Sequence, residues 1–328
     1  MTLLIKVVLL LLTTLYQMVM SWWEDQKSPP GQLINIGQSR LHLYTLGEKR
    51  PTIVLDHSLG GIEGYFLIEE LSQLARVCIY DRAGYGWSDS SPYPRHSQQI
   101  VQELEALLTQ AKIEPPYILI GDSFGSFNVR LYAHLFPEKV VGLILTDGLH
   151  DQEIRQMPIA LQGLKLFFLS GFVMSIFGAI LGIIRLLGVV GVFEWLKPEL
   201  RRVPPQALAW VKRSFYRPQH WLTMGREIFN LSKSAQQVSV AQDLGSLPIV
   251  SIKASSFFKP SLWTFLIPLK GANRLREKMH RALSHLSTNY QQIEAPQSGH
   301  FVWLDQPHIM VEAVKMLLEQ LENPRTDE

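Results

Sequence analysis

The sequence predicts an α/β fold: a mostly parallel, doubly wound sheet with a helical cap insertion and an N-terminal hydrophobic helix. Three observations lead to this prediction. Short β-rich segments alternate with helical patterns along the main body, one long segment interrupts the alternation, and the chain begins with an apolar run. Alternating strands and helices are typical of open sheets with helices on both faces.

The composition excludes several classes of protein. Lys and Arg number 31 and Asp and Glu 29, so the formal net charge of +2 is far from that of a nucleic-acid-binding protein. The single cysteine, Cys78, excludes an intrachain disulfide framework and a multi-cysteine metal site. The histidines lack the spacing of a metal site, and Gly84-x-Gly86 lacks the third glycine of a dinucleotide fingerprint, so neither a metal nor another cofactor is expected. Charged residues make up 18% of the chain, which indicates a folded protein in contact with a membrane.

Residues 1–23 are expected to form a membrane anchor helix. The run from Val7 to Trp23 has no charge and ends on two tryptophans, which favour the membrane interface. A cleaved signal peptide is the alternative, although the bulky segment Met18–Met20 offers no small-residue cleavage site. The flanking charges favour a main domain on the non-cytoplasmic side, or secretion if the helix is cleaved.

Residues 30–328 are expected to form the main domain. Several of its β-rich segments are apolar on both faces, as buried parallel strands are. The expected strands are 41–46, 52–55, 77–80, 117–120, 141–146, 249–252 and 290–293. Helical spacing of apolar residues recurs at 97–108, 127–136 and 309–321.

The long interruption covers residues 151–244, between the fifth and sixth expected strands. It is too long for a loop and predicts an inserted helical cap, or lid. Its uncharged run from Leu166 to Ile184 is long enough to cross a membrane. A crossing there would place the two halves of one sheet on opposite sides of the membrane. We therefore expect a helical lid whose apolar face covers a pocket or rests on lipid, with a buried core helix as the alternative.

The strongest motif is Gly121-Asp122-Ser123-Phe124-Gly125, which follows a buried strand and precedes a helical pattern. In this strand–turn–helix context, the two glycines allow the strand to turn sharply into the helix. The turn presents the hydroxyl of Ser123 at a helix N-terminus, where free N–H groups and the helix dipole favour negative charge. Ser123 is therefore predicted to be a nucleophile.

Four segments together resemble the α/β-hydrolase family. Besides the Ser123 turn, Thr52–Gly61 is similar to the family's strand and oxyanion loop, and Val77–Asp89 to its Asp-Arg-x-Gly-x-Gly-x-Ser segment. Ser298–Pro307 is similar to the loop that supplies the catalytic histidine. The segments occur in the family's order over about residues 33–321. The resemblance implies a serine hydrolase of the esterase or lipase kind that needs no cofactor.

The resemblance also implies roles for individual residues. Ser123 would attack a carbonyl carbon, and His300 would take the serine proton and pass it to the leaving group. The backbone N–H groups of Phe124 and Leu59 would hold the oxyanion.

The sequence departs from the family's pattern at Ser58 and Asp122. Ser58 stands where the family usually has a glycine and would stiffen the oxyanion loop. Asp122 stands where histidine is common, and either adds an anion beside the nucleophile or faces solvent. Asp81 and Arg82 are expected to form a buried ion pair or a loop brace rather than a catalytic pair.

The acid of the expected triad is less obvious. The family most often places it after the penultimate strand, but residues 254–293 contain no aspartate and a single glutamate, Glu277. The alternative position, after the strand that follows the nucleophile helix, offers Asp147 at a strand's C-terminal end. We therefore assign Asp147, followed by Asp151 and Glu277, with Asp243 less favoured.

The sequence thus predicts a serine hydrolase for an ester, or less favourably an amide or thioester, with an apolar or acyl portion. The hydrophobic insertion supports an apolar, lipid-like substrate. One alternative is a non-catalytic binding protein with this fold, and another is an acyltransferase or cofactor-free haloperoxidase. Epoxide hydrolases and haloalkane dehalogenases are disfavoured, because they need aspartate at the position of Ser123.

Overall fold

The structure is a computed structural model that describes residues 2–157, 159–257 and 269–323. Its centre is an eight-stranded sheet with the order β1-β2-β4-β3-β5-β6-β7-β8. The strands are β1 (Gln32–Asn35), β2 (Arg40–Leu46), β3 (Thr52–Asp56), β4 (Val77–Asp81), β5 (Tyr117–Asp122), β6 (Val140–Thr146), β7 (Ile249–Ala254) and β8 (Tyr290–Ala295). The pairs β1–β2 and β2–β4 are antiparallel, and the other pairs are parallel.

The predicted mostly parallel sheet is confirmed, including all seven expected strands. β1 is not predicted by the sequence, because this short antiparallel edge strand is half exposed and lacks a continuous apolar run. By contrast, β3, β4 and β5 are buried along their whole length, as their apolar sequences require.

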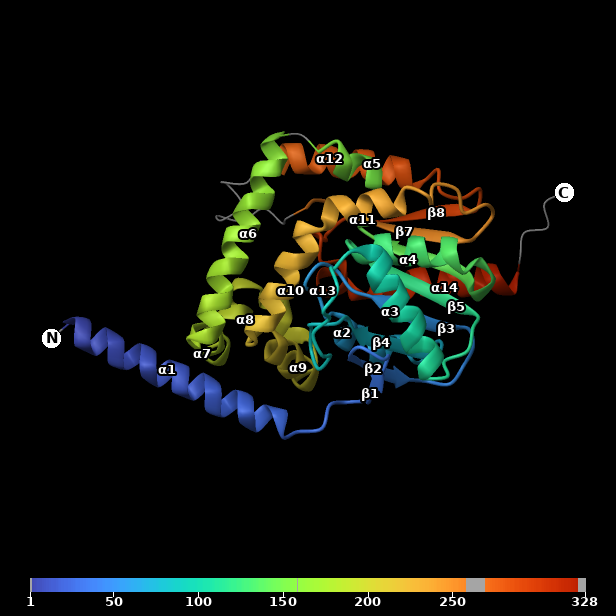
Figure 1. The fold of residues 1–328 in the computed structure, drawn as a ribbon. Coiled ribbons are helices and arrows are strands. Elements are labelled where there is room, and N and C mark those ends of the chain that lie inside the picture. The colour runs from blue at the N-terminus through green and yellow to red at the C-terminus, as the bar shows by residue number, and fades with distance from the viewer. Residues whose placement is uncertain (1, 158, 258–268, 324–328) are drawn as a thin grey trace.

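Helices cover both faces of the sheet (Figure 1). On one face lie α3 (Ser97–Gln110) and α4 (Gly125–Leu135), and on the other α2 (Gly64–Leu71) and α14 (Pro307–Glu322). In α3, the apolar side chains at spacings of three and four are the buried ones. Each face of the sheet therefore has its own hydrophobic core.

Helices also fill the segments that connect the last three strands. Between β6 and β7 lie α5 (Asp151–Arg155), α6 (Ile159–Ile180), α7 (Ile183–Val189), α8 (Val192–Leu196), α9 (Pro205–Phe215), α10 (Pro218–Phe229) and α11 (Leu231–Val238), with a 3-10 turn at Pro198–Arg202. α12 (Leu269–Leu283) lies between β7 and β8, and α13 (Val302–Asp305) follows β8. A further 3-10 turn, Pro137–Lys139, precedes β6. In Figure 1, α6 lies at the left margin of the molecule and α12 at the top.

The N-terminal helix α1 (Thr2–Asp25) projects from the rest of the protein (Figure 1). It is long and apolar enough to cross a membrane, and its apolar part is almost entirely exposed. Within the described residues, α6 and α7 meet the same criterion only when taken together, and they meet at an angle of 83°.

Candidate active site

Ser123 occupies a sharp turn between β5 and α4. Its φ of +49° lies in the left-handed region, which costs energy for a residue with a side chain. A Cβ on Gly121 would overlap with Val129 and the backbone of Gly125, and a Cβ on Gly125 would overlap with the carbonyl of Asp56. Both glycines are therefore needed where the strand turns into the helix.

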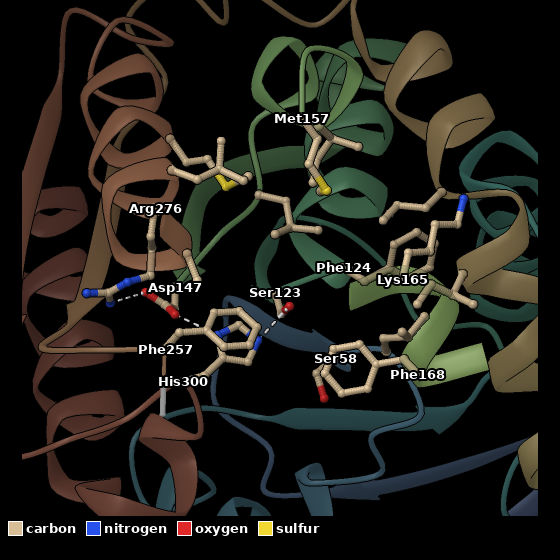
Figure 2. A pocket seen from close by; sticks show the side chains of 18 of the residues that line it. Ser58, Ser123, Phe124, Asp147, Met157, Lys165, Phe168, Phe257, Arg276 and His300 are labelled. Carbon is tan, nitrogen blue, oxygen red and sulfur yellow. Dashed lines mark hydrogen bonds and ion pairs between the residues drawn. The ribbon is translucent and has the colours of Figure 1, made fainter. Parts of the chain in front are cut away.

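The structure brings Ser123, His300 and Asp147 together (Figure 2). Nε2 of His300 lies 2.8 Å from Oγ of Ser123, and Nδ1 of His300 lies 2.6 Å from Oδ2 of Asp147. An ionised carboxylate only accepts hydrogen bonds, so Nδ1 carries the proton toward Asp147. The lone pair on Nε2 of the neutral ring then faces the serine hydroxyl, as proton transfer from Ser123 to His300 requires.

Asp147 directly follows β6 with a φ of +41°, and its side chain is fully buried. Its Oδ1 accepts hydrogen bonds from Nη1 of Arg276 at 2.8 Å and from Nε2 of His280 at 3.0 Å. Burial by itself would raise the pKa of Asp147. The hydrogen bonds from His280 and His300 and the charge of Arg276 outweigh burial and hold that pKa well below its usual value. Asp147 is therefore a carboxylate.

The other carboxylates considered as the acid lie elsewhere. Asp151 pairs with Nη2 of Arg130 at 3.0 Å, and Glu277 is half exposed and lies 3.1 Å from Lys253. Asp243 caps its own turn by accepting from the N–H of Gly245.

The sequence does not single out two further hydrogen-bond partners of Asp147, Arg276 and His280. Arg276 and His280 are buried on α12, four residues apart and so on one face of the helix. That spacing, on a helix that follows the penultimate strand, is the one signal that could have drawn attention to them.

The residues expected to supply oxyanion donors lie above Ser123. Phe124 directly follows the serine at the start of α4, Leu59 belongs to the loop after β3, and both line the cavity. Among the described residues, neither backbone N–H donates a hydrogen bond to another backbone group. Two free N–H groups beside a nucleophile can hold a negatively charged oxygen.

Comparison with known proteins identifies the fold. Residues 51–173, which carry the Ser123 turn and Asp147, match the family model described as "alpha/beta hydrolase fold". The chain has the α/β-hydrolase fold.

Two curated relatives carry membrane-related names. Over 93% of its length, the chain is 26% identical to "Probable transporter efuK" from Hormonema carpetanum, and the matched region is 45% of that protein. Over 32% of its length, the chain is 33% identical to an "Uncharacterized vacuolar membrane protein" from Saccharomyces cerevisiae, and the matched region is 17% of that protein. The chain thus spans less than half the length of these relatives.

Solved structures share the α/β-hydrolase fold at low sequence identity. The epoxide hydrolase CorEH is 16% identical with a TM-score of 0.65, over 88% of this chain and 98% of its own. The enol-lactonase from Burkholderia xenovorans LB400 is 16% identical with a TM-score of 0.58, over 88% of this chain and 100% of its own. An esterase from Thermogutta terrifontis is 17% identical with a TM-score of 0.58, over 86% of this chain and 94% of its own.

Arg82 braces the loop after β3, which contains Leu59. Its guanidinium donates to Asp56 at 2.7 Å and to Glu227 on α10 at 2.9 Å. It also donates to the backbone carbonyls of His57 and Ser58, at 2.7 and 2.9 Å. The loop-brace interpretation of Arg82 is therefore correct.

An ion pair between Asp81 and Arg82 is not what the structure shows. Asp81 instead lies 3.1 Å from Nδ1 of His42 and accepts from the hydroxyl of Tyr65. The two neighbours point to different partners because successive residues at a strand end face opposite sides of the sheet.

Asp122 does not face solvent, since it is 2% exposed. Burial, followed by the negative charge of Glu63, raises the pKa of Asp122 well above its usual value. Burial and Glu63 thus both favour the neutral form of the Asp122 carboxyl over an anion beside Ser123. Glu63 accepts from the N–H of Ser58 at 2.6 Å, so this buried group is part of the support beneath the oxyanion loop.

A cavity of about 290 Å³ opens above Ser123. Figure 2 shows Phe124, Phe168, Phe257 and Met157 around it. Most of its lining is apolar and comes from the loop before α6 and from α6, α10 and α12. Such a cavity favours an apolar substrate portion next to the serine.

Proposed function

We propose that the chain is a membrane-anchored serine hydrolase that cleaves an ester with a large apolar portion. One observation carries this proposal: Ser123, His300 and Asp147 form a continuous hydrogen-bonded series that ends in an apolar cavity. An amide or thioester substrate would use the same groups.

In the proposed reaction, Oγ of Ser123 bonds to the ester carbonyl carbon while His300 takes the serine proton. Asp147 holds the protonated ring in place and stabilises its charge. The N–H groups of Leu59 and Phe124 bind the oxyanion, a contribution of about 3–4 kcal/mol per donor in comparable enzymes. The ester C–O bond then breaks, and His300 gives its proton to the departing alcohol. Water hydrolyses the acyl-enzyme by the same steps in reverse.

The cavity supports the apolar part of the substrate assignment. Phe168 and Phe172 of α6 and Met224 and Ile228 of α10 line the same cavity as Ser123. Aromatic and aliphatic side chains of this kind bind acyl chains better than sugars or charged peptides.

The anchor assignment relies on α1. Its exposed apolar surface and the terminal pair Trp22 and Trp23 fit a single membrane-spanning helix. We place the hydrolase domain, residues 30–328 with the helical cap at 151–244, on the non-cytoplasmic side. Secretion after cleavage remains the alternative outcome.

The test uses purified full-length chain with short p-nitrophenyl esters and a fluorophosphonate probe. Ser123→Ala is expected to lose both ester turnover and probe labelling, and mass spectrometry of the native chain should find the probe on Ser123. Ser72→Ala, outside the cavity, is the matched control and should retain both. Labelling that persists in Ser123→Ala would refute the role of Ser123.

Two alternatives are outcomes of related measurements. A non-catalytic binding protein would show no labelling of the native chain. An acyltransferase or cofactor-free haloperoxidase would show labelling, but its acyl group would pass to glycerol or peroxide in preference to water when all three compete.

A further inference from the structure

From Leu166 to Ile180, helix α6 carries no charged side chain. Its inner face, with Phe168 and Phe172, lines the cavity above Ser123. Its outer face is exposed and consists of Leu166, Phe167, Val173, Met174, Phe177 and Ile180. A helix that is apolar all round normally lies in a protein core or in lipid. The inner face of α6 is covered by protein, but its outer face is not.

The exposed apolar surface continues beyond α6. It extends over α7 and the residue after it through Ile183, Leu186, Leu187, Val189 and Val190. Figure 1 shows α6 and α7 on the side of the molecule from which α1 projects. An exposed apolar surface of this extent marks a contact with a membrane or a partner. Its continuity with the proposed anchor favours the membrane.

The corner between α6 and α7 packs directly against α1. Gly182, with a φ of +77°, lies so close to α1 that a Cβ there would overlap with the backbone carbonyl of Thr13. The side chain of Gln17, in the same part of α1, is buried and donates to the carbonyl of Tyr216 at 2.8 Å. The apolar part of α1 and the corner between α6 and α7 therefore lie side by side.

The buried charge at this corner is neutralised by α1. Arg185 donates to Gln17 at 2.6 Å and forms a two-point ion pair with Glu24. Near the end of α1, Arg213 and Arg217 pair with Asp25 at 2.8 and 2.9 Å. Paired arginines of this kind allow the apolar residues around them to enter lipid without an isolated charge.

We propose that α6 and α7 form a re-entrant membrane element, inserted into the same leaflet as the C-terminal half of α1. The cavity above Ser123 would then receive its substrate from the lipid phase, because α6 lines the cavity on one side and is exposed on the other. This inference rests on the proposed anchoring by α1 and deepens the proposed function by making its substrate a bilayer-dissolved ester.

Site-specific labelling tests the insertion without any need for enzyme activity. Full-length chain in phosphatidylcholine vesicles would carry an environment-sensitive fluorophore on Phe177→Cys or, as the matched control, on Leu135→Cys at the end of α4. Phe177 and Leu135 are both exposed, at 61% and 46%. Burial raises the pKa of Cys78 to about 12, so the native thiol will not compete for the label.

We expect spin-labelled lipid to quench the label at position 177 and aqueous iodide to quench the label at position 135. Iodide quenching at 177 equal to that at 135 would overturn the proposal. A label at position 177 that is quenched neither by iodide nor by spin-labelled lipid would also overturn the proposal. In that case another protein surface, such as a second copy of the chain, would cover α6.

A charge on the outer face tests the substrate route. Met174→Glu should slow hydrolysis of p-nitrophenyl palmitate dissolved in vesicles by about tenfold or more, because a charge in the leaflet opposes insertion. Hydrolysis of soluble p-nitrophenyl acetate should change by less than about twofold, as for an ordinary surface substitution. Leu135→Glu is the control and should leave both rates unchanged.

Equal slowing of both substrates, or of neither, would refute the lipid route. If the native chain hydrolyses neither ester, the proposed function fails, while the quenching experiment still decides whether α6 is inserted.

Discussion

Oδ2 of Asp147 lies 2.6 Å from Nδ1 of His300, although the two residues are 153 positions apart in the chain. If Asp147 orients the histidine, Asp147→Asn should leave the fold intact but favour the wrong tautomer of the ring. We expect kcat for a short p-nitrophenyl ester to fall by about 10³–10⁴-fold. Steady-state kinetics on the purified chain, with circular dichroism as a check of folding, would measure this.

The controls for this substitution are the other carboxylates considered as the acid. Glu277 is half exposed and pairs with Lys253, so Glu277→Gln should keep nearly full activity. A loss in Glu277→Gln as large as that in Asp147→Asn would contradict the assignment of Asp147.

The depressed pKa of Asp147 predicts how stability depends on pH. A carboxylate whose folded pKa lies below its unfolded value, about 3.9, stabilises the fold above that pH and loses this effect as the pH falls through the acid range. Asp147→Asn has no such group. The difference in Tm between the native chain and Asp147→Asn should therefore be largest above about pH 4 and narrow below it. Thermal melts between about pH 3 and 7 would show this, and a difference that widens in acid would be inconsistent with it.

Arg276 should act as a positioning residue through Asp147. Its Nη1 donates to Oδ1 of Asp147 at 2.8 Å and also to the carbonyl of Ala254. In Arg276→Gln, Asp147 loses a fixed partner, and we expect kcat to fall by up to about 100-fold. Arg274→Gln, an exposed neighbour on α12, is the control. A merely structural role would instead lower the amount of folded protein and leave the kcat of the folded fraction unchanged.

The sheet could be predicted from the sequence because its central strands are short apolar runs bounded by turn residues. The turn at Ser123 could also be predicted, since glycines on both sides of a serine between a strand and a helix are typical of a sharp turn that presents a nucleophile. These features are local, and local patterns are visible without the fold. The edge strand Gln32–Asn35 has no such pattern, so it could not be predicted from the sequence.

The environment of the candidate acid shows where sequence reasoning stops. Asp147 and Asp151 follow the same strand, and it is their tertiary partners that distinguish them: Asp147 contacts His300, whereas Asp151 pairs with Arg130. Arg276 and His280 share a helix face, but nothing in the sequence says that this face meets Asp147. Asp122 is buried against Glu63 by packing between β5 and the segment before α2, so its protonation depends on tertiary contacts.

Arg82 offers a test of the brace beneath the oxyanion loop. Arg82→Met would leave Asp56 and Glu227 buried without a counter-charge, which typically costs about 3–5 kcal/mol of folding stability. The exposed pair between Arg40 and Asp89 is the matched control, and Arg40→Met should change stability little. Denaturant unfolding of the full-length chain would compare the two, and equal effects would contradict a buried brace.

Arg82→Lys separates the charge of Arg82 from its geometry. Lysine keeps the positive charge between Asp56 and Glu227 but lacks the planar fork that also holds the carbonyls of His57 and Ser58. We therefore expect Arg82→Lys to recover part of the stability lost in Arg82→Met. Its rate of ester hydrolysis should nevertheless be lower than that of the native chain, because the oxyanion loop is no longer fixed. Full recovery of activity together with stability would mean that charge alone supports the loop.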